Sequence, residues 1–110
     1  MKGNSKNDRD TTGMNEGMWY YMYIEDSVKA FARLKEIREQ LFKLMATSGD
    51  RKVAIFSKYD KDTGGVHYYF SPSSREVALA HRAIPCEQPS RQQAGSLLFG
   101  DQDMVEKLFE

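Results

Sequence analysis

The longest periodic stretch of the chain runs from Asp26 to Gly49. Apolar residues recur there at spacings of four and three, which places them on one stripe of an α-helix. The stripe consists of Ala30, Leu34, Ile37, Leu41 and Leu44, widened by Phe31 and Met45. Asp26 or Ser27 can cap the first turn, and Gly49 can take the left-handed conformation just past the end. The pattern therefore predicts a long amphipathic helix that must pack on another surface.

Short runs rich in aromatic and β-branched residues follow a different pattern. The runs at 18–24, 52–59 and 66–70 have the length and composition of β-strands. The segment Asp60–Gly65 joins the last two runs, and its Asp residues and paired Gly favour a turn with positive φ. These two runs are expected to form an antiparallel hairpin.

The last forty residues predict shorter elements. The Ser-Pro-Ser-Ser sequence at 71–74 starts a second helix, with Ser73 and Glu76 at capping-box spacing, and this helix should end near Arg82 because Pro85 blocks its continuation. Residues 85–95 read as a loop. Residues 96–99 could form a short last strand, and residues 102–109 an amphipathic helix.

This order of elements predicts an α+β fold, a two-layer sandwich with a small antiparallel sheet and two main helices on one face. The nearest common arrangement is the ferredoxin-like plan, β-α-β-β-α-(β)-α, with residues 96–99 as the fourth strand. Residues 1–17 contain no aromatic or branched aliphatic residue and are expected to form a disordered arm. Residues 18–110 then form a single α+β domain.

The predicted strands carry apolar side chains on both faces. Alternation with a period of two puts one set toward the helices: Tyr20, Met22, Ile24, Val53, Ile55, Val66, Tyr68 and Phe70. It puts a mostly aromatic set on the opposite face: Trp19, Tyr21, Tyr23, Phe56, His67 and Tyr69. An antiparallel sheet with one solvated face normally shows polar residues there, so the second set marks an interaction surface. Its cover could be the C-terminal segment, a second copy of the chain, or a stacked ligand or nucleic acid.

The charge balance and the cysteine content limit the classes of partner and the cross-links that we expect. The chain of 110 residues has sixteen basic and sixteen acidic residues, so no overall field attracts nucleic acid or an anionic membrane. Residues 27–52 carry four more basic than acidic residues, and residues 100–110 carry three more acidic than basic ones. The single cysteine, Cys86, excludes an internal disulfide. Without a secretory signal or a membrane-length apolar run, we expect a cytoplasmic protein with no membrane partner.

The sequence contains no complete motif for a catalytic or metal-binding site. Cys86 follows a helix C-terminus, which disfavours a thiolate, and His81 lies five residues before it. The segment from Asp60 begins like a calcium loop but lacks the later acidic ligands, and the two His residues and Cys86 have no zinc-site spacing. No metal or cofactor is therefore expected. Three arginines near the second helix form a weak candidate anion site: Arg75, Arg82 and Arg91.

We therefore expect a small non-enzymatic interaction module that associates through the aromatic face, with itself or with a protein partner. Single-stranded nucleic-acid binding on the same face, assisted by Arg51, Lys52 and Lys58, is an alternative. The RNA recognition motif works in this way, but the chain has Gly64 where that family has a basic residue. A third alternative is a small enzyme or anion binder that uses Cys86, His81 and the three arginines.

Overall fold

The computed structural model describes residues 17–110. Residues 1–16, and with them almost all of the expected disordered arm, lie outside the described residues. The elements follow one another as β1 (Trp19–Ile24), α2 (Ser27–Ser48), β2 (Ile55–Tyr59), β3 (Val66–Phe70), the 3₁₀ turn η1 (Pro72–Ser74), α3 (Arg75–Ala80), β4 (Ile84–Cys86), α4 (Arg91–Ala94), β5 (Ser96–Phe99), α5 (Gln102–Glu106) and the 3₁₀ turn η2 (Lys107–Phe109).

The strands form one five-stranded antiparallel sheet in the order β4-β1-β3-β2-β5. The α+β class, the first strand and the β2–β3 hairpin are confirmed. The short strand at 96–99 exists, but it pairs with β2 at the outer edge of the sheet. The strand on the far side of β1 is instead β4, in a segment expected to be a loop. Pro85 is tolerated in β4 because an edge strand has only one hydrogen-bonded neighbour.

The long helix has the predicted caps and buries Ala30, Leu34, Ile37 and Leu41 of the predicted stripe, whereas Phe31, expected to widen it, is 78% exposed. The Asp26 carboxylate accepts hydrogen bonds from the backbone amides of Val28 and Lys29, at 2.8 and 3.2 Å. Gly49 ends the helix in the left-handed region, with φ of 72°. The buried residues of α2 pack on the predicted helix-facing side of the sheet, in one cluster with Tyr20, Met22, Val53, Ile55, Tyr68 and Phe70. The assignment of this face is confirmed.

The Ser-Pro-Ser-Ser segment has a different role from the predicted cap. The Ser73 hydroxyl donates to the Asp50 carboxylate at 2.6 Å, so the expected capping box with Glu76 does not form. The buried hydroxyls of Ser71 and Ser74 instead accept from the amide of Ala54, at 3.0 and 2.9 Å. The Ser74 hydroxyl also donates to the Ala54 carbonyl. These bonds fix the entry to β2, which begins after residue 54 rather than at 52.

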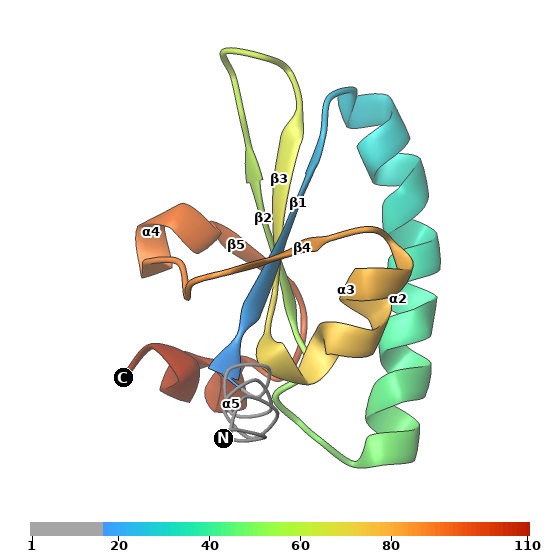
Figure 1. Cartoon of the computed structure of the whole chain (residues 1–110), viewed down its shortest axis with the longest axis vertical. Helices are drawn as coiled ribbons and strands as arrows, with labels where there is room; N and C mark the ends of the chain where they lie inside the picture. Colours follow the sequence, from blue (N-terminus) through green and yellow to red (C-terminus); the bar gives the residue numbers. More distant parts are fainter. Residues whose placement is uncertain (1–16) are drawn as a thin grey trace, which may run out of the picture.

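The second face of the sheet has its own helical cover. Figure 1 shows α2 and α3 on one side of the sheet and α4 and α5 on the other. Helix α4 lies in the segment expected to be a loop, and it has a complete capping box between Ser90 and Gln93. The helix expected at 102–109 changes to a 3₁₀ turn at Lys107. None of the helices in the described part of the chain is long and apolar enough to cross a membrane.

Candidate functional site

The C-terminal segment covers two of the six residues of the aromatic face, Trp19 and Phe56. Trp19 and Phe56 are 2% and 0% exposed. They form a cluster with Val105, and the ring of Phe109 lies 5.6 Å from that of Trp19 and 5.7 Å from that of Phe56. Leu108 and Ala94 complete the contact. These two members of the predicted face are therefore inaccessible to a partner while the cover is in place.

The other four residues of the face remain partly exposed. We call them the open aromatic patch; it consists of Tyr21, Tyr23, His67 and Tyr69, of which Tyr23 is 36% exposed and the others are partly buried. The four residues form two cross-strand pairs between β1 and β3, Tyr21 with Tyr69 and Tyr23 with His67. The ring centroids of these pairs are 5.2 and 4.8 Å apart. These contacts between the rings hold them in place on β1 and β3, which are neighbours in the interior of the sheet.

A hydrogen-bonded chain orders the centre of the patch. The Tyr21 hydroxyl lies 2.7 Å from Nδ1 of His67, and Nε2 of His67 lies 3.0 Å from the Asp60 carboxylate. Because a carboxylate only accepts, Nε2 carries the proton in the neutral imidazole and Nδ1 accepts from Tyr21. The hydrogen bond from His67 lowers the pKa of Asp60, and burial raises the pKa of Tyr21.

The hairpin turn holds Asp60 in this position. Its other carboxylate oxygen accepts from the backbone amides of Asp62 and Thr63, at 3.0 and 3.2 Å. This is the ordinary side-chain hydrogen bonding of a turn aspartate. The Tyr23 hydroxyl is bonded to the Thr63 hydroxyl. Within residues 17–110 the hydroxyl of Tyr69 has no hydrogen-bond partner, so it is the phenol of the patch that can bond to a ligand.

Two shallow grooves flank Tyr69. One, of about 340 Å³, is lined by Tyr21, Cys86, Gln88 and Pro89 among others. The second, of about 350 Å³, lies toward the β2–β3 hairpin and is lined by His67 and by both acidic and basic side chains of that hairpin. Burial raises the pKa of the Cys86 thiol, which keeps it protonated at neutral pH. The patch thus offers aromatic surface and hydrogen-bonding groups rather than a reactive nucleophile.

The residues of the weaker catalytic candidate are not brought together. Cys86 belongs to the cluster on the covered aromatic side. His81 lies at the end of α3, where Nε2 is 2.5 Å from the side-chain oxygen of Gln40 on α2. Burial lowers the pKa of His81. The two groups therefore occupy opposite faces of the sheet.

The three candidate anion-binding arginines are also engaged separately. Arg75 donates to the Tyr20 hydroxyl at 3.1 Å, on the helix-covered side. Arg91 pairs with Glu106 at 3.0 Å and lies over the rings of Phe56 and Phe109 on the other side. Arg82 is exposed just past α3, with a positive φ of 65°. No shared anion site results.

The basic side chains considered for nucleic-acid binding also contact different parts of the molecule. Arg51 forms an ion pair with Asp101, which caps the start of α5. Lys58 donates to the backbone carbonyl of Gln92 at 3.2 Å and lines the groove beside Tyr69. Of the three candidate cations, only Lys58 lines a groove beside the open aromatic patch.

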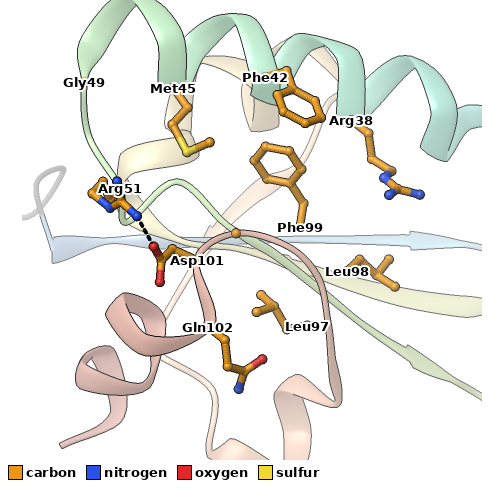
Figure 2. A pocket seen from close by; sticks show the side chains of 11 residues that line it. Arg38, Phe42, Met45, Gly49, Arg51, Leu97, Leu98, Phe99, Asp101 and Gln102 are labelled. Carbon is orange, nitrogen blue, oxygen red and sulfur yellow. Dashed lines mark hydrogen bonds and ion pairs between the residues drawn. The ribbon is translucent and has the colours of Figure 1, made fainter.

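A larger groove, which the sequence patterns did not predict, lies on the helix-covered side. It has a volume of about 740 Å³ and runs between α2 and the segment from β5 to the start of α5. Figure 2 shows Phe42 and Phe99 facing each other between Arg38 at one end and the Arg51–Asp101 pair at the other. The available signal was Phe42 itself, an aromatic residue outside the apolar stripe of the helix.

The described residues contain no group of three or more His, Cys, Asp or Glu side chains that could hold a metal ion. Comparison of the chain with protein-family models, with curated proteins and with solved structures found no match. The function must therefore be argued from the surfaces of this molecule alone.

Proposed function

We propose that the protein is a non-enzymatic binding module that contacts a protein or peptide partner through the open aromatic patch. The observation that carries the proposal is that four aromatic rings lie partly exposed on adjacent strands, where a solvated sheet face would be polar. Tyrosine suits such contacts because it offers a large rigid surface and a hydroxyl at low entropic cost. The hydroxyl of Tyr69, which has no hydrogen-bond partner among residues 17–110 and lies between two grooves, is the central anchor.

The charges around the patch favour a peptide over nucleic acid. The two grooves beside Tyr69 are lined by three acidic residues, Asp60, Asp62 and Glu87, against two lysines. Phosphate contacts supply most of the sequence-independent affinity for nucleic acid, and such a border repels phosphates. A peptide with apolar and aromatic groups needs no positive field.

Replacement of Tyr69 tests the proposal. Random dodecapeptides displayed on phage would be selected on the immobilised protein, and the affinity of an enriched peptide would be measured by fluorescence anisotropy. Tyr69→Ser should weaken binding at least about tenfold, as expected for a central anchor. The matched control is Phe31→Ser, since Phe31 is an exposed aromatic residue on α2 that lines neither of the two grooves beside Tyr69. Failure to enrich any peptide, or equal binding by both variants, would refute the proposal.

Single-stranded nucleic acid is the second candidate, because the aromatic residues lie on two neighbouring strands and bases could stack on them. A labelled mixed-sequence RNA 12-mer would then bind to the wild type with an affinity that falls steeply between low and physiological salt. Tyr69→Ser would weaken this binding as well. Salt-dependent RNA binding together with a failed peptide selection would move the assignment to nucleic acid.

We also infer that the segment from β1 to β4 is a ferredoxin-like unit to which β5 and α5 are additions. The supporting observation is the strand order β4-β1-β3-β2 for the chain order β-α-β-β-α-β. In this arrangement β1 and β3 occupy the centre of the unit. The open aromatic patch then occupies its middle strands.

A further inference from the structure

Helix α2 carries further apolar residues beside the stripe that it buries. Phe31, Phe42 and Met45 lie on this side of the helix, with the charged Lys35 and Arg38 between Phe31 and Phe42, and Phe31 and Phe42 are 78% and 61% exposed. Helix α3 packs along the other flank of α2, near Leu44. The sheet has five strands, but only α2 and α3 cover this face, so the flank of α2 toward β5 has no neighbouring helix within the described residues.

The groove of about 740 Å³ lies on this uncovered part of the sheet, between α2 and β5. Its floor is formed by Leu98 and Phe99 on β5, and its wall by Phe42 and Met45 on α2. The rings of Phe42 and Phe99 meet edge to face, with centroids 5.0 Å apart and an interplanar angle of 80°. A volume of about 740 Å³ lies within the range of small-molecule sites, which are mostly apolar with a few polar groups.

The charges at the two ends of the groove differ. Arg51 is already paired with Asp101. Arg38, at the other end, has no ion pair and no hydrogen bond to another side chain within residues 17–110, and it also lines the shallower groove toward Phe31. The groove therefore combines an apolar floor and wall with one guanidinium that has no ion pair among residues 17–110. Such a site is complementary to an apolar chain that ends in an anion.

A second copy of the chain fits this surface less well. A two-fold contact between two α2 helices through this side would bring Lys35 and Arg38 of both copies into one interface, with only Glu39 as an acidic residue lining the same groove. Like charges in an interface cost free energy. The free arginine thus favours an anionic occupant over self-association.

We propose that the groove between α2 and β5 binds a small amphipathic carboxylate of the medium-chain fatty-acid type. The carboxylate is held by the Arg38 guanidinium, which can donate two parallel hydrogen bonds to it. The hydrocarbon chain lies on Phe42, Leu98 and Phe99. This site is on the opposite side of the sheet from the open aromatic patch, and the inference does not depend on the function proposed for that patch.

Titration calorimetry with decanoate and with decan-1-ol, both below their aggregation limits, separates the two parts of the site. The two probes share the chain and differ in charge. Decanoate should bind to the wild type about two- to fivefold more tightly than the alcohol, the range expected for an ion pair to an exposed arginine. Arg38→Gln should abolish this difference, and it leaves the fold intact because the side chain is exposed.

Two further variants complete the test. The control Arg33→Gln removes an exposed arginine of α2 that does not line the groove, and it should keep the preference for decanoate. Phe42→Ser should weaken both probes about tenfold, with helical circular dichroism unchanged. Absence of decanoate binding to the wild type, or an unchanged preference in Arg38→Gln, would overturn the proposal. Tyr69→Ser should bind decanoate normally, so this result is independent of the peptide assay.

Discussion

The C-terminal cover of Trp19 and Phe56 depends on one fully buried side chain, Val105. This residue is 1% exposed, whereas Leu108 and Phe109 beside it are only partly buried. Replacing Val105 by Asp removes the burial of a whole valine side chain, worth about 1.5–3 kcal/mol. It also places an unpaired carboxylate in an apolar cluster, which costs several kcal/mol more unless the segment opens. We therefore expect residues 102–110 to undock while the rest of the fold remains, since peripheral segments open at lower free energy than the core.

Trp19 reports this opening directly, because it is the chain's only tryptophan and is buried under the cover. Its fluorescence emission should shift to longer wavelength in Val105→Asp. The far-ultraviolet circular dichroism should stay close to that of the wild type, because the 22 residues of α2 lie outside the affected region. The control is Gln102→Asp, which adds the same charge at an exposed position of the same helix and should leave the emission unchanged.

Two outcomes would refute this reasoning. An unshifted emission in Val105→Asp would mean that the segment stays on Trp19 without its buried valine. A simultaneous loss of the helical signal would mean that the cover is an inseparable part of the core rather than a local unit. A clean shift would give a variant in which the whole aromatic face is exposed, and this variant should bind the selected peptide at least as well as the wild type.

Three further predictions concern the supports of the fold. Ser74→Ala should lower the free energy of unfolding by about 1–3 kcal/mol in urea titration, because it leaves buried backbone groups before β2 with fewer partners. Gly95→Ala should lower the melting temperature more than Gly49→Ala: both glycines have positive φ, but only at Gly95 would the new methyl group collide with the backbone of β2. The pKa of Asp60 is lowered in the folded state by its hydrogen bond from His67, so its stabilisation is complete above the unfolded pKa near 3.8 and is lost as the pH falls through the lower folded value. Asp60→Asn should therefore flatten this acid limb of the unfolding midpoint, and a limb of unchanged steepness would contradict the assignment.

Local patterns were sufficient for the long helix, the β2–β3 hairpin and the two faces of the sheet. The helix is specified within itself, by the Asp26 cap, the apolar stripe and Gly49. The hairpin is specified by its turn, and the alternation of its residues then determines both faces. These features depend on contacts between near neighbours in the sequence, which is why periodicity and capping rules predict them.

The edges of the sheet could not be predicted in this way. Strand β4 is three residues long and contains Pro85, and it exists because β1 offers it an open edge. Helix α4 has a local signal, the Ser90–Gln93 capping box, but it is one turn long and lies in a segment rich in loop-forming residues. The groove beside α2 was also out of reach, because its floor is β5, more than fifty residues farther along the chain.

The open aromatic patch and the groove beside α2 differ in how well a mutation separates an effect on binding from an effect on stability. The rings of Tyr21 and Tyr69 pack on each other, so replacing either one changes stability as well as binding, and only a ligand assay with a matched control separates the two effects. Phe42 is mostly exposed but also meets the buried Phe99 edge to face, so its replacement can change stability as well as binding. Arg38 is exposed and has no ion pair among residues 17–110, so a lost preference for decanoate in Arg38→Gln would report the groove itself. The structure thus allows the groove to be tested with less ambiguity than the aromatic patch that the sequence indicated first.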